Sequence, residues 1–165
     1  MSTPSEDREE NFLYQRPLED WHKVLQVNLT GVLLTNQLAV QHMLRLNIPG
    51  SIINLASIAG RRPLPGAGDY CVSKAGVIML TQVMAAEMAA QNIRINAIGP
   101  GFIETPMTAS IRQSPMWQEV MIGMTPMQRL GQASEIAETA LFLASDQSSY
   151  FTGETLFPSG GMYVG

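Results

Sequence analysis

A serine, a tyrosine and a lysine stand in this chain at a spacing that suits proton transfer to a carbonyl oxygen. Tyr70 and Lys74 are four residues apart, so on a helix their side chains share one face and can approach each other. Ser57 precedes Tyr70 by thirteen residues and follows an apolar segment that is typical of a buried strand. A phenol can protonate a carbonyl oxygen that receives a hydride, a neighbouring ammonium favours the phenolate, and a hydroxyl can hold the oxygen. The pattern predicts the proton-transfer half of a reductase.

A fourth polar residue would connect the lysine to solvent, and Asn28 is the upstream candidate. Each part has an ordinary structural explanation as well. A Tyr-x-x-x-Lys pair is common on an exposed helix face, Ser57 can simply end a strand, and Asn28 can be a satisfied polar group within a helix. Only the order and spacing of the four residues together carry the functional prediction.

The hydrophobic pattern predicts alternating helices and strands that position these residues. The expected helices cover residues 18–46, 69–91 and 134–144, and the expected strands cover residues 51–56, 93–98 and 154–157. Such alternation predicts an α/β fold with parallel strands and helices packed on the faces of the sheet. Residues 1–17 are polar and aperiodic, which predicts a flexible N-terminal segment before one domain, residues 18–165.

Composition narrows the class of protein. The chain has 165 residues, 45% of them hydrophobic, and a net charge of −4, which favours a globular domain and argues against nucleic acid binding. No apolar run approaches the ~20 residues of a membrane span, and the polar N-terminus is unlike a secretory signal. The single cysteine, Cys71, fits a cytoplasmic protein. His22 and His42 are far apart and have no third ligand, so no metal site is expected.

The ordered motifs resemble the C-terminal two-thirds of a short-chain dehydrogenase/reductase (SDR). The matching segments are Val27-Asn28-Leu29-Thr30-Gly31, Gly50 to Gly60, Tyr70 to Gly76, Ile93 to Thr105, Phe142 to Asp146 and Gly160-Gly161. The resemblance implies a Rossmann-like parallel sheet with flanking helices. It also implies an NAD(P)-dependent oxidoreductase that transfers a hydride between a nicotinamide cofactor and a carbonyl or alcohol.

The resemblance implies a role for each residue at a matching position. Asn28, Ser57, Tyr70 and Lys74 would form the catalytic tetrad of the family. The tyrosine would be the general acid/base, the serine would orient the substrate, the lysine would activate the tyrosine and bind the nicotinamide ribose, and the asparagine would anchor a water. The residues implied to contact NAD or NADP are Tyr70, Lys74, Pro100, Gly101, Ile103 and Thr105.

The sequence departs from the family pattern at its beginning. The 165 residues contain no Gly-rich turn of the kind that seats a dinucleotide pyrophosphate, and no residue that would select NAD over NADP. About three strands are expected where the family has about seven, so the fold is expected to be N-terminally truncated. The alternative prediction is therefore a non-catalytic SDR fragment that cannot bind cofactor and acts by association if at all. A third possibility, an unrelated α/β binding module, is disfavoured by the ordered motifs.

The segment that covers the substrate in the family is rich in methionine here. Flexible, polarizable side chains suit an irregular apolar ligand, although ordinary packing of a mobile lid explains them equally well. These residues are Met107, Met116, Trp117, Met121, Met124 and Met127. The expected substrate is a small apolar carbonyl or alcohol. Small residues on the two long helices are compatible with close packing between subunits, and the resemblance implies a homo-oligomer.

Overall fold

Three parallel strands form the central sheet of the computed structural model, which describes residues 12–109 and 113–164. These are β1 (Gly50–Leu55), β2 (Ile93–Ile98) and β5 (Thr155–Leu156), in the spatial order β1-β2-β5. Gly50 lies opposite Ile93 at one end of β1, and Leu55 lies opposite Ile98 at the other. The three predicted strands are confirmed to within one or two residues, and the parallel α/β class is confirmed with them.

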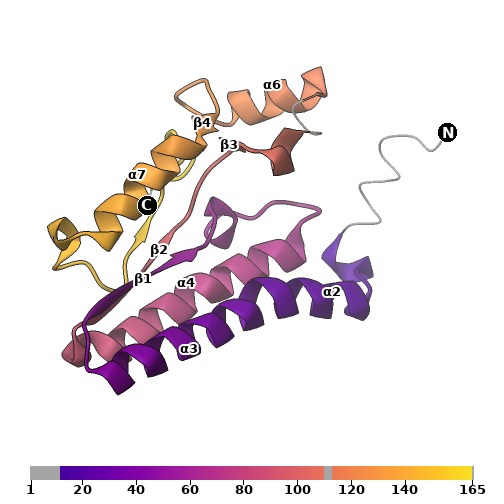
Figure 1. The fold of residues 1–165 in the computed structure, drawn as a ribbon. Helices are drawn as coiled ribbons and strands as arrows, with labels where there is room; N and C mark the ends of the chain where they lie inside the picture. Colours follow the sequence, from indigo (N-terminus) through magenta and orange to yellow (C-terminus); the bar gives the residue numbers. More distant parts are fainter. Residues whose placement is uncertain (1–11, 110–112, 165) are drawn as a thin grey trace.

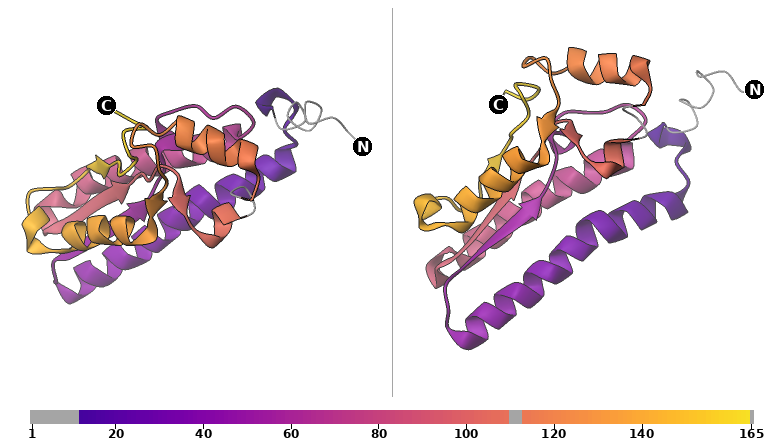
Figure 2. Two further views of the ribbon diagram at one scale, coloured as in Figure 1. Left: turned by 90° about the horizontal axis from the view of Figure 1, so that it is seen from above. Right: turned by 45° about the horizontal axis from the view of Figure 1, so that its top comes forward.

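Helices cover both faces of this sheet (Figures 1 and 2). The helices α3 (Gly31–Leu46) and α4 (Gly68–Met88) lie on one face, and α7 (Ala133–Ala144) lies on the other. The isoleucines of β2 alternate with other residues and are fully shielded between the layers, with Ile95 0% exposed. Burial on both faces explains why β1 and β2 read as nearly continuous apolar runs in the sequence.

The long N-terminal helix is interrupted where the sequence predicted one continuous helix over residues 18–46. The α-helix α2 (Leu18–Leu25) passes into a π-helical turn, Gln26–Thr30, before α3 begins. The N–H of Gly31 bonds to the carbonyl of Gln26, five residues back. Gln26 and Thr30, the first and last residues of the turn, keep right-handed helical backbone angles. Such single turns occur frequently at functional sites.

A second, smaller pair of strands was not predicted. β3 (Ile103–Glu104) pairs in parallel with β4 (Gly131–Gln132), and α6 (Pro115–Gly123) lies between them in the chain. Two-residue strands are too short to show a period in the sequence. Short 3-10 turns complete the described chain at Leu13–Gln15, Ile58–Gly60, Ala89–Gln91, Pro106–Thr108 and Asp146–Ser148.

The helix Gly68–Gln91 is, among the described residues, long and apolar enough to cross a membrane by length and composition alone. The expectation that no segment meets those criteria therefore needs correction. In the structure this helix packs along β2 and supplies core residues such as Val77 and Thr81, both 0% exposed. A core helix of a layered protein meets the same criteria as a membrane span.

The N-terminal segment is described from residue 12 onward, and residues 1–11 of the predicted flexible segment lie outside the described part. Leu13–Gln15 forms a 3-10 turn, and Arg16 forms an ion pair with Asp69 at the start of α4, with Nη2 2.7 Å from Oδ2. The placement of a domain boundary after residue 17 stays a prediction.

Candidate active site

Tyr70 and Lys74 lie one turn apart at the start of α4. The Lys74 ammonium lies 5.7 Å from the centroid of the Tyr70 ring. It donates a hydrogen bond of 2.8 Å to the carbonyl of Leu55, the last residue of β1. Partial burial lowers the pKa of Lys74 from 10.5, because desolvation disfavours the charged ammonium. The ammonium is thus held between the tyrosine and the carboxyl end of the sheet.

Ser57 begins the turn that follows β1. Its hydroxyl accepts a hydrogen bond of 3.1 Å from the N–H of Ala59, which caps the 3-10 turn Ile58–Gly60. The N–H of Ile58 donates to the carbonyl of Pro100 at 3.1 Å, so the segments after β1 and β2 are tied together. The structure therefore brings Ser57 and Pro100 to the same end of the parallel sheet, where open α/β folds bind ligands.

Gly60 fixes the distance between the serine turn and α4. A Cβ at Gly60 would lie 2.8 Å from both the carbonyl carbon and the carbonyl oxygen of Lys74. Only a residue without a side chain permits this approach of one main chain to another. The Ser57 turn and the Lys74 turn are consequently packed backbone to backbone, although they are separated by many residues in the sequence.

Asn28 lies within the π-helical turn and contacts Ser73, the residue before Lys74. Its Nδ2 donates to the Ser73 hydroxyl at 3.2 Å, and that hydroxyl donates to the Tyr70 carbonyl at 2.7 Å. Ser73 is 0% exposed. The sequence prediction did not include Ser73. The signal that could have identified it is a small polar residue directly before the lysine, on the same face of α4 as the buried Val77 and Thr81.

The segment after β2 holds the remaining expected cofactor contacts. The N–H of Gly101 donates to the Pro158 carbonyl at 3.2 Å, and a Cβ at Gly101 would lie 2.9 Å from the Ser159 Cα. Thr105 caps the next turn, where its N–H donates to the Thr108 hydroxyl at 3.1 Å. Pro100 and Gly101 thus lie beside the serine turn, whereas Ile103 and Thr105 belong to the separate β3 segment.

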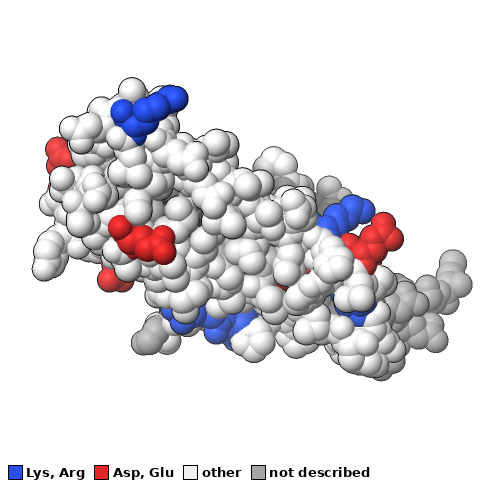
Figure 3. Space-filling model, turned by 90° about the horizontal axis from the view of Figure 1, so that it is seen from below, with Lys and Arg blue, Asp and Glu red and all other residues white. Residues whose placement is uncertain are grey.

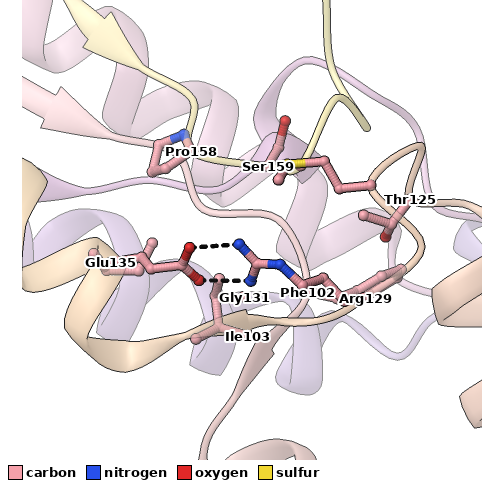
Figure 4. A pocket seen from close by; sticks show the side chains of 11 residues that line it. Phe102, Ile103, Thr125, Arg129, Gly131, Glu135, Pro158 and Ser159 are labelled. Atoms are coloured by element: carbon pink, nitrogen blue, oxygen red, sulfur yellow. Dashed lines mark hydrogen bonds and ion pairs between the residues drawn. The ribbon is translucent and has the colours of Figure 1, made fainter.

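A cavity of about 190 Å³ lies among the segment that follows β2, the start of α7 and the segment that follows β5 (Figure 4). Phe102, Ile103 and Pro158 line it, and the ion pair between Arg129 and Glu135 lies in it. None of Asn28, Ser57, Tyr70 and Lys74 lines this cavity. Of the expected cofactor contacts, Ile103 lines it.

The Arg129–Glu135 pair is exposed and doubly hydrogen-bonded. The two guanidinium nitrogens of Arg129 donate to the two carboxylate oxygens at 2.9 and 2.6 Å, and the N–H of Gln132 donates at 2.7 Å. The hydrogen bond from Arg129, followed by that from Gln132, lowers the pKa of Glu135 to about 2. The same pair raises the pKa of Arg129. These bonds also cap the first turn of α7.

Among the described residues, no cluster of three or more His, Cys, Asp and Glu side chains could hold a metal ion.

Known proteins are similar to this chain over most of its length. A family model described as enoyl-(acyl carrier protein) reductase matches residues 5–163. The 3-oxoacyl-(acyl-carrier-protein) reductase of Thermotoga maritima is 44% identical over 146 residues, which are 88% of this chain. The chain belongs to the short-chain dehydrogenase/reductase family. The (3R)-3-hydroxyacyl-CoA dehydrogenase of Canis lupus familiaris is 42% identical over 94% of the chain, and 3beta-hydroxysteroid dehydrogenase 1 of Eggerthella lenta is 44% identical over 90%.

Solved SDR structures share the fold. A 2-deoxy-D-gluconate 3-dehydrogenase from Agrobacterium tumefaciens with bound NADP matches 92% of this chain with a TM-score of 0.89 and 32% identity. A 4-hydroxyisoleucine dehydrogenase complexed with NADH matches 93% with a TM-score of 0.90 and 28% identity. The chain spans 57–59% of the length of the three curated relatives and 61–63% of these two structures. The predicted family and Rossmann-like class are confirmed.

Proposed function

We propose that this chain carries the proton-transfer site of an NAD(P)-dependent oxidoreductase that interconverts a carbonyl and an alcohol. The observation that carries the proposal is the position of the Lys74 ammonium, 5.7 Å from the Tyr70 ring centroid and hydrogen-bonded to the end of β1. Tyr70 is the proposed general acid/base, which gives a proton to the substrate oxygen and takes one back, and the Lys74 ammonium stabilises the negative charge that develops beside it.

Ser57 and Asn28, the other two residues of the tetrad, position the substrate oxygen and a water in the proposed reaction. Ser57 lies at the carboxyl end of the sheet, where its hydroxyl is to hydrogen-bond the substrate oxygen and hold it toward Tyr70. Asn28 bonds Ser73 and thereby ties the π-helical turn to the helix turn that carries Tyr70 and Lys74. In the proposed reaction Asn28 anchors a water that links Lys74 with solvent.

The residues present fit the nicotinamide half of the cofactor. A phenol hydroxyl and an ammonium within one helix turn are hydrogen-bond donors suited to the hydroxyls of a ribose. We assign Tyr70, Lys74, Pro100, Gly101, Ile103 and Thr105 to this half. The bound nicotinamide supplies or accepts the hydride. NAD and NADP share this half, so both are candidates.

The proposed substrate is a small apolar ketone or secondary alcohol. Relatives are named for 3-oxoacyl, 3-hydroxyacyl and hydroxysteroid substrates, all of which join a reactive carbonyl or alcohol to an apolar body. On α6 the chain exposes Met116 and Trp117, at 54% and 38%. Met121 is buried instead, and the side chain of Met107 lies outside the described part. We place the protein in the cytoplasm, with partners that include neither membrane nor nucleic acid.

Turnover of acetoacetyl-CoA with NADH or NADPH, followed by nicotinamide absorbance, tests the proposal. Replacing Tyr70 by Phe removes the acid/base and is expected to lower the rate by at least about 100-fold. Tyr150→Phe is the matched control, because Tyr150 is 100% exposed. A Tyr70→Phe variant that keeps the wild-type rate would remove Tyr70 from the reaction.

The second candidate function is association without catalysis. It is favoured by the exposed apolar side chains of Val27, Leu34 and Leu38, which are 69, 51 and 68% exposed. Titration of NADH and NADPH, with nicotinamide fluorescence as the readout, separates the two. Saturable binding supports the oxidoreductase, and none up to millimolar cofactor supports the association function.

We also propose that the protein is a homo-oligomer through its long helices. Residues Val27, Leu34 and Leu38 are 69, 51 and 68% exposed, and Val72, Met79 and Val83 of α4 repeat the same spacing. Figure 3, which looks onto the molecule from the side of α2 and α3, shows a mostly uncharged surface. Light scattering is expected to give a multiple of the 18.0 kDa monomer mass, reduced by Leu38→Glu and unchanged by Gln118→Glu, a control at an exposed position on α6.

A further inference from the structure

We infer that Arg16 and Asp69 are positioning residues for Tyr70. The inference rests on the proposed function, because it concerns the placement of the proposed acid/base. It assigns the segment before α2, which the sequence predicted to be a flexible lead, a part in the construction of the site.

The Asp69 carboxylate is held from two directions. Its Oδ1 accepts a hydrogen bond of 2.8 Å from the backbone N–H of Tyr70. Its Oδ2 accepts from Arg16, at 2.8 Å from Nε and 2.7 Å from Nη2. The Asp69 side chain is 6% exposed and that of Arg16 is 23% exposed. The carboxylate therefore joins the N-terminal segment directly to the main chain of Tyr70.

The first turn of α4 needs such a contact. The N–H groups of the first turn of an α-helix have no partner within the helix, and an acidic side chain there also interacts favourably with the helix dipole. Leu13 adds an apolar contact, since a Cβ at Gly68 would lie 3.0 Å from the Leu13 Cδ1. Leu13 and Arg16 together hold the turn from which the Tyr70 side chain projects.

The charge that each substitution leaves buried determines how strongly the variant is expected to disturb the site. Arg16→Gln leaves a buried carboxylate without its counter-charge, next to the Tyr70 backbone, and is the most disruptive change. Asp69→Asn leaves a half-buried guanidinium that can reach solvent, so its effect is smaller. The double variant Arg16→Gln with Asp69→Asn leaves no buried charge and is milder than Arg16→Gln alone. Arg16→Lys keeps the charge but loses the second nitrogen contact, so it restores part of the function.

The experiment measures kinetics and backbone protection on the same variants of the full chain. With acetoacetyl-CoA and NADPH, Arg16→Gln is expected to lower kcat about 10-fold and change KM less than about twofold, because a small misplacement of an acid/base slows the chemical step. Exchange of the Tyr70 amide hydrogen, followed by NMR, is expected to accelerate about 10-fold as the turn opens locally. Arg45→Gln is the control, since Arg45 is exposed on α3, where its Nη2 lies 3.1 Å from the Nδ1 of His42.

The two readouts separate the possible failures. Partial recovery of kcat and Tyr70 protection in the double variant and in Arg16→Lys supports the inference. Faster amide exchange with an unchanged kcat would mean that the pair is only structural, which overturns it. Unchanged exchange in Arg16→Gln also overturns it, with or without turnover. If the wild-type chain shows no turnover, the proposed function fails, while exchange at Tyr70 still decides whether the pair positions this residue.

Discussion

The scaffold and the lid of this molecule hold their residues in different ways. The scaffold, which comprises β1, β2, the Ile58–Gly60 turn and α4, brings main chains into direct contact at Gly60 and buries Ile95 and Val77 completely. The segment named here the lid, residues 103–109 and 113–132, is joined by a pair of two-residue strands and exposes Met116 and Met127 at 54% and 59%. Groups proposed for proton transfer stand on the scaffold, where position is fixed, and the apolar side chains proposed for substrate contact stand on the lid, where shape can adapt.

One glycine in each region gives the largest expected contrast. Gly60→Ala places a Cβ 2.8 Å from the backbone of Lys74, which cannot move aside cheaply, and should lower the free energy of unfolding by about 2 kcal/mol. Gly123→Ala, at the end of α6, meets no atom within 4 Å. It should raise that free energy by up to about 1 kcal/mol, through helix propensity. Urea denaturation measures both, and equal effects at the two positions would contradict the contrast between scaffold and lid.

The two ion pairs differ in how far their side chains are buried. The Arg16–Asp69 pair has side-chain exposures of 23% and 6%, against 47% and 44% for Arg129–Glu135. Arg16→Gln is therefore expected to cost about 2 kcal/mol of unfolding free energy, because it strands a buried carboxylate. Arg129→Gln should lower it much less, since exposed pairs are screened by water and salt. A larger loss for Arg129→Gln would show that burial does not rank these pairs.

Because of Lys74, the free energy of unfolding should depend on pH in the alkaline range. Its pKa is lowered in the fold from 10.5, so between the lowered pKa and 10.5 the unfolded chain binds more protons than the folded one. The free energy of unfolding should then rise with pH across that window, as the cost of the buried charge disappears. Urea denaturation at several pH values measures the difference in free energy of unfolding between wild type and Lys74→Met. As the pH rises through the window, this difference should become more favourable to wild type. A difference that stays constant would refute the desolvation of Lys74.

Glu135 should give the smallest change in the free energy of unfolding, and this change occurs at acid pH. Its cause is stabilisation of the charged carboxylate by hydrogen bonds, whereas burial destabilises the charged form of Lys74. Hydrogen bonds from Arg129 and Gln132 lower its folded pKa to about 2, so its contribution is present above the unfolded value of 4.5. The contribution is lost as the pH falls from 4.5 toward about 2, because the unfolded state takes up the proton first. Thermal unfolding of Glu135→Gln should show a weaker acid dependence than wild type. Matching slopes for the two proteins would contradict the low pKa.

Much of the scaffold could be predicted from the sequence because its signals are local. The strand at Ile93–Ile98 has the predicted bounds, since β-branched residues between Asn92 and Gly99-Pro100 leave little choice of register. The helix that carries Tyr70 and Lys74 was predicted to within one residue at its start. The roles of Asn28, Ser57, Tyr70 and Lys74 stay predictions. In the structure Tyr70 and Lys74 lie near the start of α4, Ser57 follows the end of β1, and Asn28 lies within the π-helical turn.

The features that escaped prediction depend on long-range contacts or on very short elements. Arg16 and Asp69 are separated by 53 residues, and nothing in the polar N-terminal segment indicates which carboxylate an arginine will reach. β3 and β4 have two residues each. The extra backbone residue in Gln26–Thr30 leaves the hydrophobic pattern almost unchanged, so a period of 3.6 residues describes both sides of it.

That extra residue makes the π-helical turn a constraint of its own. An α-helix turns by about 100° and advances about 1.5 Å per residue, so winding Gln26–Thr30 as regular α-helix with no residue removed would rotate everything before it by about that angle. Asn28 would leave Ser73, and α2 would move the Arg16 end of the chain away from α4. Deleting one residue of Gln26–Thr30 would instead remove the extra residue, and regular α-helix could then join α2 to α3 in the same orientation. The orientation of α2 relative to α3 therefore depends on this wider turn more than on most of its side chains.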